Sequence, residues 1–309
     1  MKKSIIHKLS PFNNDTDMSS GLLVVKKLLA FFLCYAAGML AGNLIIIGIM
    51  AACGKDLSQG ETFGDSVMEL LGLYGMIAMI AAAVLYRKLI EKKKPSETGI
   101  AKNAGSWLMG AAMGAGLLII CIAAIMLTGS ITYEGISTAF DVKMSVLLLG
   151  GYAVQSSAEE FLCRGLVFGS LKDKVSLPLA VAANTFVFII PHLSTLSASE
   201  PVYMISGILC LIVISCVFSF ITLRTGSIWA ACGLHTLWNY FLACVLGLNL
   251  SGSQGTASSV INMRATGESL LNGGRYGIEA SLLTAAVTAA AAVLLWYSCK
   301  KNNTERQEG

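Results

Sequence analysis

Eight long apolar stretches are the feature that most constrains how this chain can fold. A helix that crosses a membrane needs about 20 mostly apolar residues, and its backbone must satisfy its own hydrogen bonds because hydrocarbon supplies none. The sequence predicts eight such helices, at about residues 28–52, 66–87, 107–128, 144–171, 177–193, 203–223, 227–247 and 279–299. We therefore predict an all-α fold: a polytopic membrane helix bundle with about eight transmembrane helices.

The composition agrees with a membrane protein. Of the 309 residues, 55% are hydrophobic and only 13% are charged, and the mean hydropathy is +0.70. A soluble domain carries about 25% charged residues. The nine cysteines include no CxxC pair and lie mostly inside apolar segments, which favours free, buried thiols over disulfides or metal ligation. The first apolar run is long enough to span a membrane, so no removable signal peptide is predicted.

The apolar stretches leave no room for a separate soluble domain. We predict a polar cytoplasmic segment at 1–27, a single transmembrane helical domain at 28–299 and a cytoplasmic tail at 300–309. Within the transmembrane domain, residues 248–278 are rich in Gly, Ser and Asn and form the only long loop expected.

The distribution of basic residues predicts the orientation. Seventeen of the 22 Lys and Arg fall on one side of the eight predicted helices, four fall on the other side, and Arg164 lies within a helix. Cytoplasmic loops of membrane proteins carry the excess of Lys and Arg. Both termini are therefore expected in the cytoplasm, in a multi-pass protein of the plasma membrane.

Polar side chains interrupt three of the predicted helices. Charged residues in hydrocarbon are costly, and they commonly mark functional sites. The fourth, fifth and seventh helices carry, respectively, Glu159, Glu160 and Arg164, then Phe188 and His192, then His235 and Asn239. Counted from the cytoplasmic ends at about 1.5 Å per residue, the three groups lie roughly 16–21 Å deep. The shared depth predicts that they form one site.

Helical spacing assigns different tasks to the two glutamates. Glu160 and Arg164 are four residues apart on one helix face, where an ion pair can form. Glu159 points about 100° away and remains available for chemistry. His235 and Asn239 are also four residues apart and face the same space.

A structural role is the alternative for these residues, because intramembrane His and Asn often connect helices by hydrogen bonds. An ion pair needs only one glutamate, however, and does not explain two histidines at the same depth. Two histidines and a carboxylate suit a water molecule that is activated by a metal or by the carboxylate alone. The sequence contains no GxSxG elbow and no HExxH helix that would indicate another hydrolytic mechanism.

The three motifs resemble those of the CAAX prenyl protease and bacteriocin-processing family of intramembrane peptidases, also called CPBP or Abi proteins. The resemblance covers about residues 144–247 and includes the stretches "EEFLCRGLVFGSL" and "TGSIWAACGLHTLWNYF". The family pattern is Glu-Glu-x-x-x-Arg, then Phe-x-x-x-His, then His-x-x-x-Asn or Asp. One departure is Cys163, where an aromatic residue is common in the family.

The resemblance implies an intramembrane endopeptidase that hydrolyses a peptide bond in a membrane-associated or lipidated substrate. It implies that Glu159 activates water while His192 and His235 bind a metal or polarise that water. A zinc ion on these three residues is expected, and a mechanism that uses glutamate alone stays open. The expected catalytic residues are Glu159, Glu160, Arg164, His192, His235 and Asn239. The expected partners are a peptide or lipidated-protein substrate and the lipid bilayer, with no nucleic acid.

Two other functions compete with the peptidase hypothesis. A membrane immunity or peptide-binding protein of the same family would keep the cavity without catalysis. Every motif position is intact in this chain, which favours the enzyme. A transporter that relays protons through Glu159 and the histidines would show repeated halves with interrupted helices. The sequence shows no such repeat, and the polar residues gather in one part of the chain.

Overall fold

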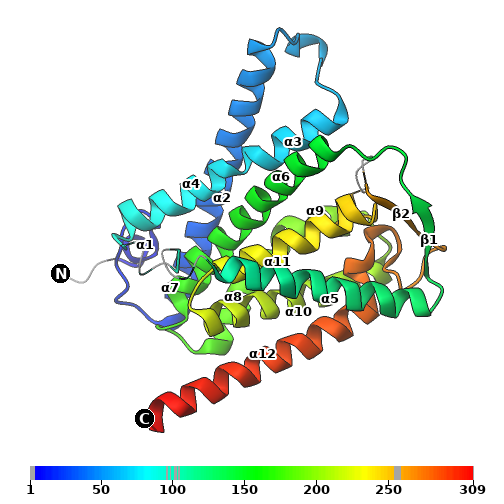
Figure 1. Ribbon diagram of the computed structural model, residues 1–309. Helices are drawn as coiled ribbons and strands as arrows, with labels where there is room; N and C mark the ends of the chain where they lie inside the picture. Colours follow the sequence, from blue (N-terminus) through cyan, green and yellow to red (C-terminus); the bar gives the residue numbers. More distant parts are fainter. Residues whose placement is uncertain are drawn as a thin grey trace.

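The chain forms a bundle of long helices with one small two-stranded sheet, as described by a computed structural model (Figure 1). The structure describes residues 4–94, 97, 99–100, 103, 105–253 and 259–308, with side chains up to residue 301. The chain is mostly helical, as predicted. Residues 1–3 of the predicted N-terminal segment and the predicted cytoplasmic Lys102 lie outside the described residues.

The helices range in length from three residues to 33. They are α1 Ile5–Leu9, α2 Ser20–Ala52, α3 Asp65–Gly75, α4 Ile77–Leu85, α5 Ser106–Leu127, α6 Val142–Glu160, α7 Gly169–Leu171, α8 Leu177–Ile189, α9 Leu193–Leu196, α10 Pro201–Thr225, α11 Trp229–Tyr240 and α12 Leu282–Glu308. Short π-helical segments extend three of them: η2 Tyr86–Ile90, η4 Phe161–Phe168 and η6 Phe241–Val245. The 3₁₀ turns are η1 Leu57–Gln59, η5 Ile190–His192, η7 Gly274–Tyr276 and η8 Ile278–Ala280.

Six helical segments in the described part of the chain are long and apolar enough to cross a membrane. They are Ser20–Ala52, Asp65–Ile90, Ser106–Leu127, Leu177–Leu196, Pro201–Thr225 and Leu282–Lys301. The predicted count of about eight is thus not confirmed. The two other predicted spans, 144–171 and 227–247, are helical, but α6 is less apolar and α11 has only 12 residues before its π-helical end. These two helices carry most of the polar motif residues.

The outward surface of the bundle is apolar. Large aliphatic side chains on α2, α5 and α12 are more than half exposed, among them Leu40, Leu44, Leu108, Ile119 and Leu294. A soluble protein rarely leaves so much apolar surface in contact with water. These faces fit the hydrocarbon of a bilayer, and the polar groups of the helices are directed inward.

Three glycines allow α5 and α11 to pack very closely. A Cβ atom at Gly110, Gly114 or Gly233 would lie 1.8–2.3 Å from a backbone carbonyl oxygen of the opposite helix. Small residues at such crossings are how membrane helices gain van der Waals contact. The contact matters for function because α11 carries His235 and Asn239.

A short β-ribbon closes the end of the bundle opposite the two termini (Figure 1). Strand β1, Ile131–Ile136, pairs antiparallel with β2, Ile261–Ala265, and the register shifts at Tyr133/Gly135. The predicted loop 248–278 therefore contains ordered structure that the sequence analysis did not foresee. Helix α1 and the C-terminal part of α12 lie at the other end (Figure 1).

Candidate functional site

The two glutamates lie where one helix changes its hydrogen-bonding pattern. Helix α6 ends at Glu160, and the π-helical segment η4 continues from Phe161 without a break. π-helical turns are rare and occur often at functional sites. The side chain of Glu160 is fully buried, whereas that of Glu159 is 17% exposed. The two carboxylates therefore have different surroundings, as the helical spacing predicted.

The predicted ion pair between Glu160 and Arg164 is present. Arg164 Nη1 donates to Glu160 Oε1 at 3.1 Å, and both side chains are inaccessible to solvent. Arg164 Nη2 also donates to the backbone oxygen and the hydroxyl of Ser215 on α10, at 3.2 and 2.9 Å. The guanidinium lies over the rings of Phe188 and Phe218, 4.6 and 4.9 Å from their centroids. Arg164 thus connects η4 to both α8 and α10.

Glu160 has a second partner that the sequence did not reveal. Nδ1 of His235 lies 3.0 Å from the same Oε1 atom that accepts from Arg164. The His235 ring also stacks on Phe218, with centroids 4.9 Å apart. Because an ionised carboxylate can only accept, His235 Nδ1 carries a proton, and in the neutral ring the Nε2 atom is then an acceptor. Glu160 therefore fixes both the orientation and the tautomer of His235.

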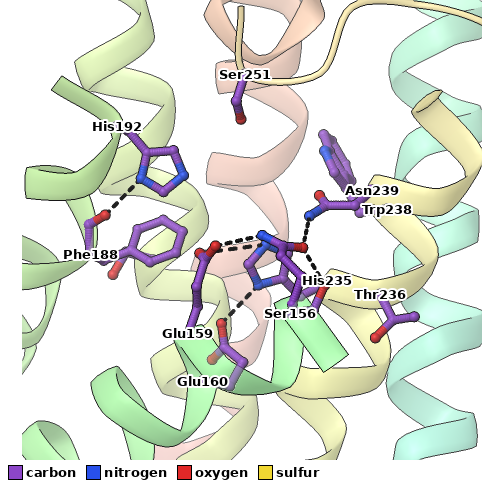
Figure 2. A network of polar contacts seen from close by, with 12 residues as sticks. Ser156, Glu159, Glu160, Phe188, His192, His235, Thr236, Trp238, Asn239 and Ser251 are labelled. Atoms are coloured by element: carbon purple, nitrogen blue, oxygen red, sulfur yellow. Dashed lines mark hydrogen bonds and ion pairs between the residues drawn. The ribbon is translucent and has the colours of Figure 1, made fainter. Parts of the chain in front are cut away.

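Glu159 faces the same histidine from the other side. Its Oε2 atom is 4.0 Å from His235 Nε2, which is too far for a direct hydrogen bond (Figure 2). A water molecule that bonds to both atoms would span such a gap. Gln155, one helical turn earlier, donates from Nε2 to Glu159 Oε1 at 2.5 Å.

Gln155 also connects Glu159 to the third motif. Asn239 Nδ2 donates to Gln155 Oε1 at 2.9 Å, and the Ser156 hydroxyl donates to the same atom at 3.3 Å (Figure 2). The chain of contacts runs from Asn239 through Gln155 to Glu159 and orients both amide groups. Sequence reasoning missed Gln155, although its position four residues before Glu159 was an available signal.

His192 reaches the site from α8 through the short turn η5. Its Nδ1 atom donates to the backbone oxygen of Phe188 at 2.9 Å, so its Nε2 atom is free to accept. The preceding Pro191 stands where the helix tightens to the 3₁₀ form. The imidazole of His192 is directed toward the side of the site where Glu159 and His235 lie (Figure 2).

One cavity of about 750 Å³ joins four of the six predicted catalytic residues, Glu159, His192, His235 and Asn239. This volume is typical of ligand pockets. Glu160 and Arg164 do not line the cavity but lie behind its wall, fully buried. The predicted meeting of the three motifs in one site is therefore observed.

The cavity also contains groups that the motifs did not indicate. Glu69 accepts a hydrogen bond from Tyr152 at 3.2 Å. Glu279 accepts from the indole of Trp238 at 3.1 Å and from the backbone and hydroxyl of Ser251 at 2.6 and 2.9 Å. All five residues line the cavity. Glu279 is the first residue of the eighth predicted helix, 279–299, and sequence analysis assigned it no role in the site.

The donor set of the cavity has the chemistry of a zinc site. Both histidines hold Nδ1 against an oxygen atom and leave Nε2 free, which is the arrangement of metal-binding imidazoles, and Glu159 adds a carboxylate. Among the described residues, however, no three His, Cys, Asp or Glu side chains are close enough together to hold one ion. Zinc on His192, His235 and Glu159 therefore stays a prediction.

Comparison with known proteins identifies the central part of the chain. Residues 141–241 match the family model of the Type II CAAX prenyl endopeptidase Rce1-like proteins. The matched region nearly coincides with residues 144–247, which carry the three motifs. The match confirms the family resemblance drawn from those motifs, and it supports a membrane protease of the CAAX family. No curated protein and no solved structure matches the chain.

Proposed function

We propose that the chain is an intramembrane endopeptidase that cleaves a membrane-associated or lipidated peptide by means of an activated water. The observation that carries the proposal is the 4.0 Å gap between Glu159 Oε2 and His235 Nε2 inside the cavity. A water in this gap would be held by two acceptors and poised to lose a proton to the carboxylate.

The geometry supports a division of labour in this reaction. Glu159 takes a proton as the water oxygen attacks the peptide carbonyl carbon, and it returns that proton to the leaving nitrogen as the C–N bond breaks. His192 and His235 present only acceptor Nε2 atoms, so they orient the water. Asn239 has a second N–H besides the one that Gln155 accepts, and it can stabilise the oxyanion. A zinc ion on His192, His235 and Glu159 would add Lewis acidity and lower the pKa of the water.

The proposal includes a topology. Residues 28–299 form one transmembrane domain in the plasma membrane, and residues 1–27 and 300–309 lie in the cytoplasm. The segments 142–171 and 229–245 cross the membrane as the fourth and seventh of eight crossings, because their polar groups are paired inside the bundle. Helix α1 and the C-terminal part of α12 lie at the same end of the bundle, which supports an even number of crossings (Figure 1).

The variant Glu159→Gln tests the mechanism. Purified parent and variant are incubated in liposomes with a defined pool of membrane-anchored peptides, farnesylated peptides included, and products are identified by mass spectrometry. General-base catalysis contributes about 10²–10⁴-fold, so the cleavage rate should fall by at least 10²-fold. Melting temperature should be unchanged or slightly higher, because a partly buried charge is removed.

The matched control is Glu69→Gln, which makes the same chemical change in the same cavity at a residue that accepts a hydrogen bond from Tyr152. The cleavage rate of this control should stay within about threefold of the parent rate, a much smaller change than the loss of a general base causes. Equal losses in the two variants would remove Glu159 from the proposed role. Peptide binding by the parent without any cleavage would instead indicate a non-catalytic protein.

A further inference from the structure

A second cavity, lined by charged side chains, lies at the end of the bundle that carries both termini. It encloses about 440 Å³ between the start of α2, the segment η2 and the turn that follows α7. It shares no lining residue with the cavity that contains Glu159. Its charged lining residues are Lys27, Arg87, Glu91, Lys93, Glu97, Asp173 and Lys174.

Two buried cations in this cavity share one carboxylate. Lys27 and Arg87 are each 4% exposed, and both form ion pairs with Glu91. Ser170 accepts from Arg87 and donates to Glu91. One positive charge remains uncompensated in this buried triad. The Nε atom of Arg87 is also buried without a hydrogen-bond partner within the described ranges. Buried charges without full compensation are costly, so a missing acceptor is indicated.

The rim of the cavity adds a second uncompensated charge. Glu97 is paired with Lys93 at 2.6 Å, and Asp173 is paired with Lys172 at 2.7 Å. Lys174 forms no ion pair with any carboxylate in the described part of the chain. The pKa of Lys174 is lowered by its partial burial and by neighbouring lysines, as expected where positive charge accumulates. The lining contains four cations and three carboxylates, and Lys172, which pairs with Asp173, adds a fifth cation beside the cavity. Five cations and three carboxylates leave an excess of two positive charges.

We propose that this cavity binds a phosphate group, carried by an anionic lipid headgroup or free in solution. A phosphate carries one or two negative charges, which matches the excess. An arginine with a hydroxyl beside it offers the donors that phosphate oxygens accept. Basic pockets between transmembrane helices, at the level of the membrane surface, are suited to anionic headgroups. The volume exceeds that of a phosphate group and leaves space for the glycerol of a lipid.

Thermal unfolding of the full chain in non-ionic detergent tests the proposal. The probes are dioctanoyl phosphatidylglycerol, inorganic phosphate, zwitterionic dioctanoyl phosphatidylcholine and sodium chloride of equal ionic strength. The proteins are the parent, Lys174→Ala and Lys88→Ala. Lys88 is an exposed lysine next to Arg87 that does not line the cavity, so its removal is the matched loss of one charge.

Phosphatidylglycerol, inorganic phosphate or both should raise the melting temperature of the parent saturably. Lys174→Ala should weaken the apparent dissociation constant about fivefold, the equivalent of about 1 kcal/mol, and Lys88→Ala should not. Stabilisation by the lipid alone identifies a headgroup site, and equal stabilisation by inorganic phosphate identifies a site for the free anion. The proposal is overturned if sodium chloride or phosphatidylcholine stabilises equally, or if both lysine variants weaken binding alike.

Discussion

Replacing Arg164 by alanine should destabilise the whole bundle, because this side chain joins three helices. The guanidinium bonds to Glu160 on its own helix and to Ser215 on α10, and it packs on the rings of Phe188 and Phe218. None of these contacts can be replaced by water, since the side chain is fully buried. The substitution would leave the Glu160 carboxylate buried with only a histidine as partner.

The expected magnitude follows from this burial. Removing one partner of a buried ion pair costs about 3–5 kcal/mol. For a chain of this size, about 2 °C per kcal/mol converts this into a decrease of about 6–10 °C in melting temperature. The double variant Glu160→Gln, Arg164→Gln removes both charges and keeps hydrogen-bonding groups. It should recover part of the loss, because no charge is left unpaired.

Parent, Arg164→Ala and the double variant should be unfolded in one detergent and at one scan rate, since unfolding of a membrane protein is often irreversible. A melting temperature of Arg164→Ala within about 1 °C of the parent would refute the reasoning. It would mean that water reaches the pair, or that Glu160 is neutral. A double variant less stable than Arg164→Ala would also contradict the reasoning, because the unpaired Glu160 carboxylate would then not be the cause of the loss.

Three further predictions follow from other parts of the structure. Gly114→Ala should lower the free energy of unfolding by about 1–3 kcal/mol, because its Cβ would clash with the backbone of α11. The control Gly116→Ala, whose Cβ would meet nothing within 4 Å, should be neutral or slightly stabilising. Equal changes in melting temperature for the two variants would contradict the close packing. Cys53 is the one exposed cysteine of the nine, so an impermeant maleimide should label one thiol per chain in intact cells, and labelling only after lysis would reverse the proposed orientation. About one zinc per chain should be bound and then lost in the double variant His192→Ala, His235→Ala; active protein without metal would leave a glutamate mechanism.

The sequence was sufficient to predict a mostly helical chain and the meeting of the three motifs in one cavity. Apolar length sets where membrane helices form, and a constant rise per residue places Glu159, His192 and His235 at a common depth. Spacing within one helix also predicted the Glu160–Arg164 pair, because residues four apart share a face.

The same reasoning could not predict the contacts between helices. The bond between Glu160 and His235 depends on how α6 and α11 are rotated about their axes, and spacing within one helix does not determine this rotation. The β-ribbon pairs Ile131–Ile136 with Ile261–Ala265 across most of the chain, and no local pattern signals so distant a partner. Helix α2 begins at Ser20, before the span expected from residue 28, and the partners that bury Lys26 and Lys27 lie far along the chain or in the preceding segment, where spacing within one helix gives no signal.

The π-helical segment Phe161–Phe168 has a consequence for how such sequences can diverge. A π-helical turn holds one more residue than an α-helical turn. Losing one residue between Gly165 and Phe168 would restore the α-helical pattern, but it would rotate the preceding part of the helix by about 100° relative to the following part. Either the carboxylate of Glu159 would turn away from the cavity, or the side chains after Phe168 would lose their packing. Related chains can therefore exchange side chains here far more readily than they can gain or lose a residue.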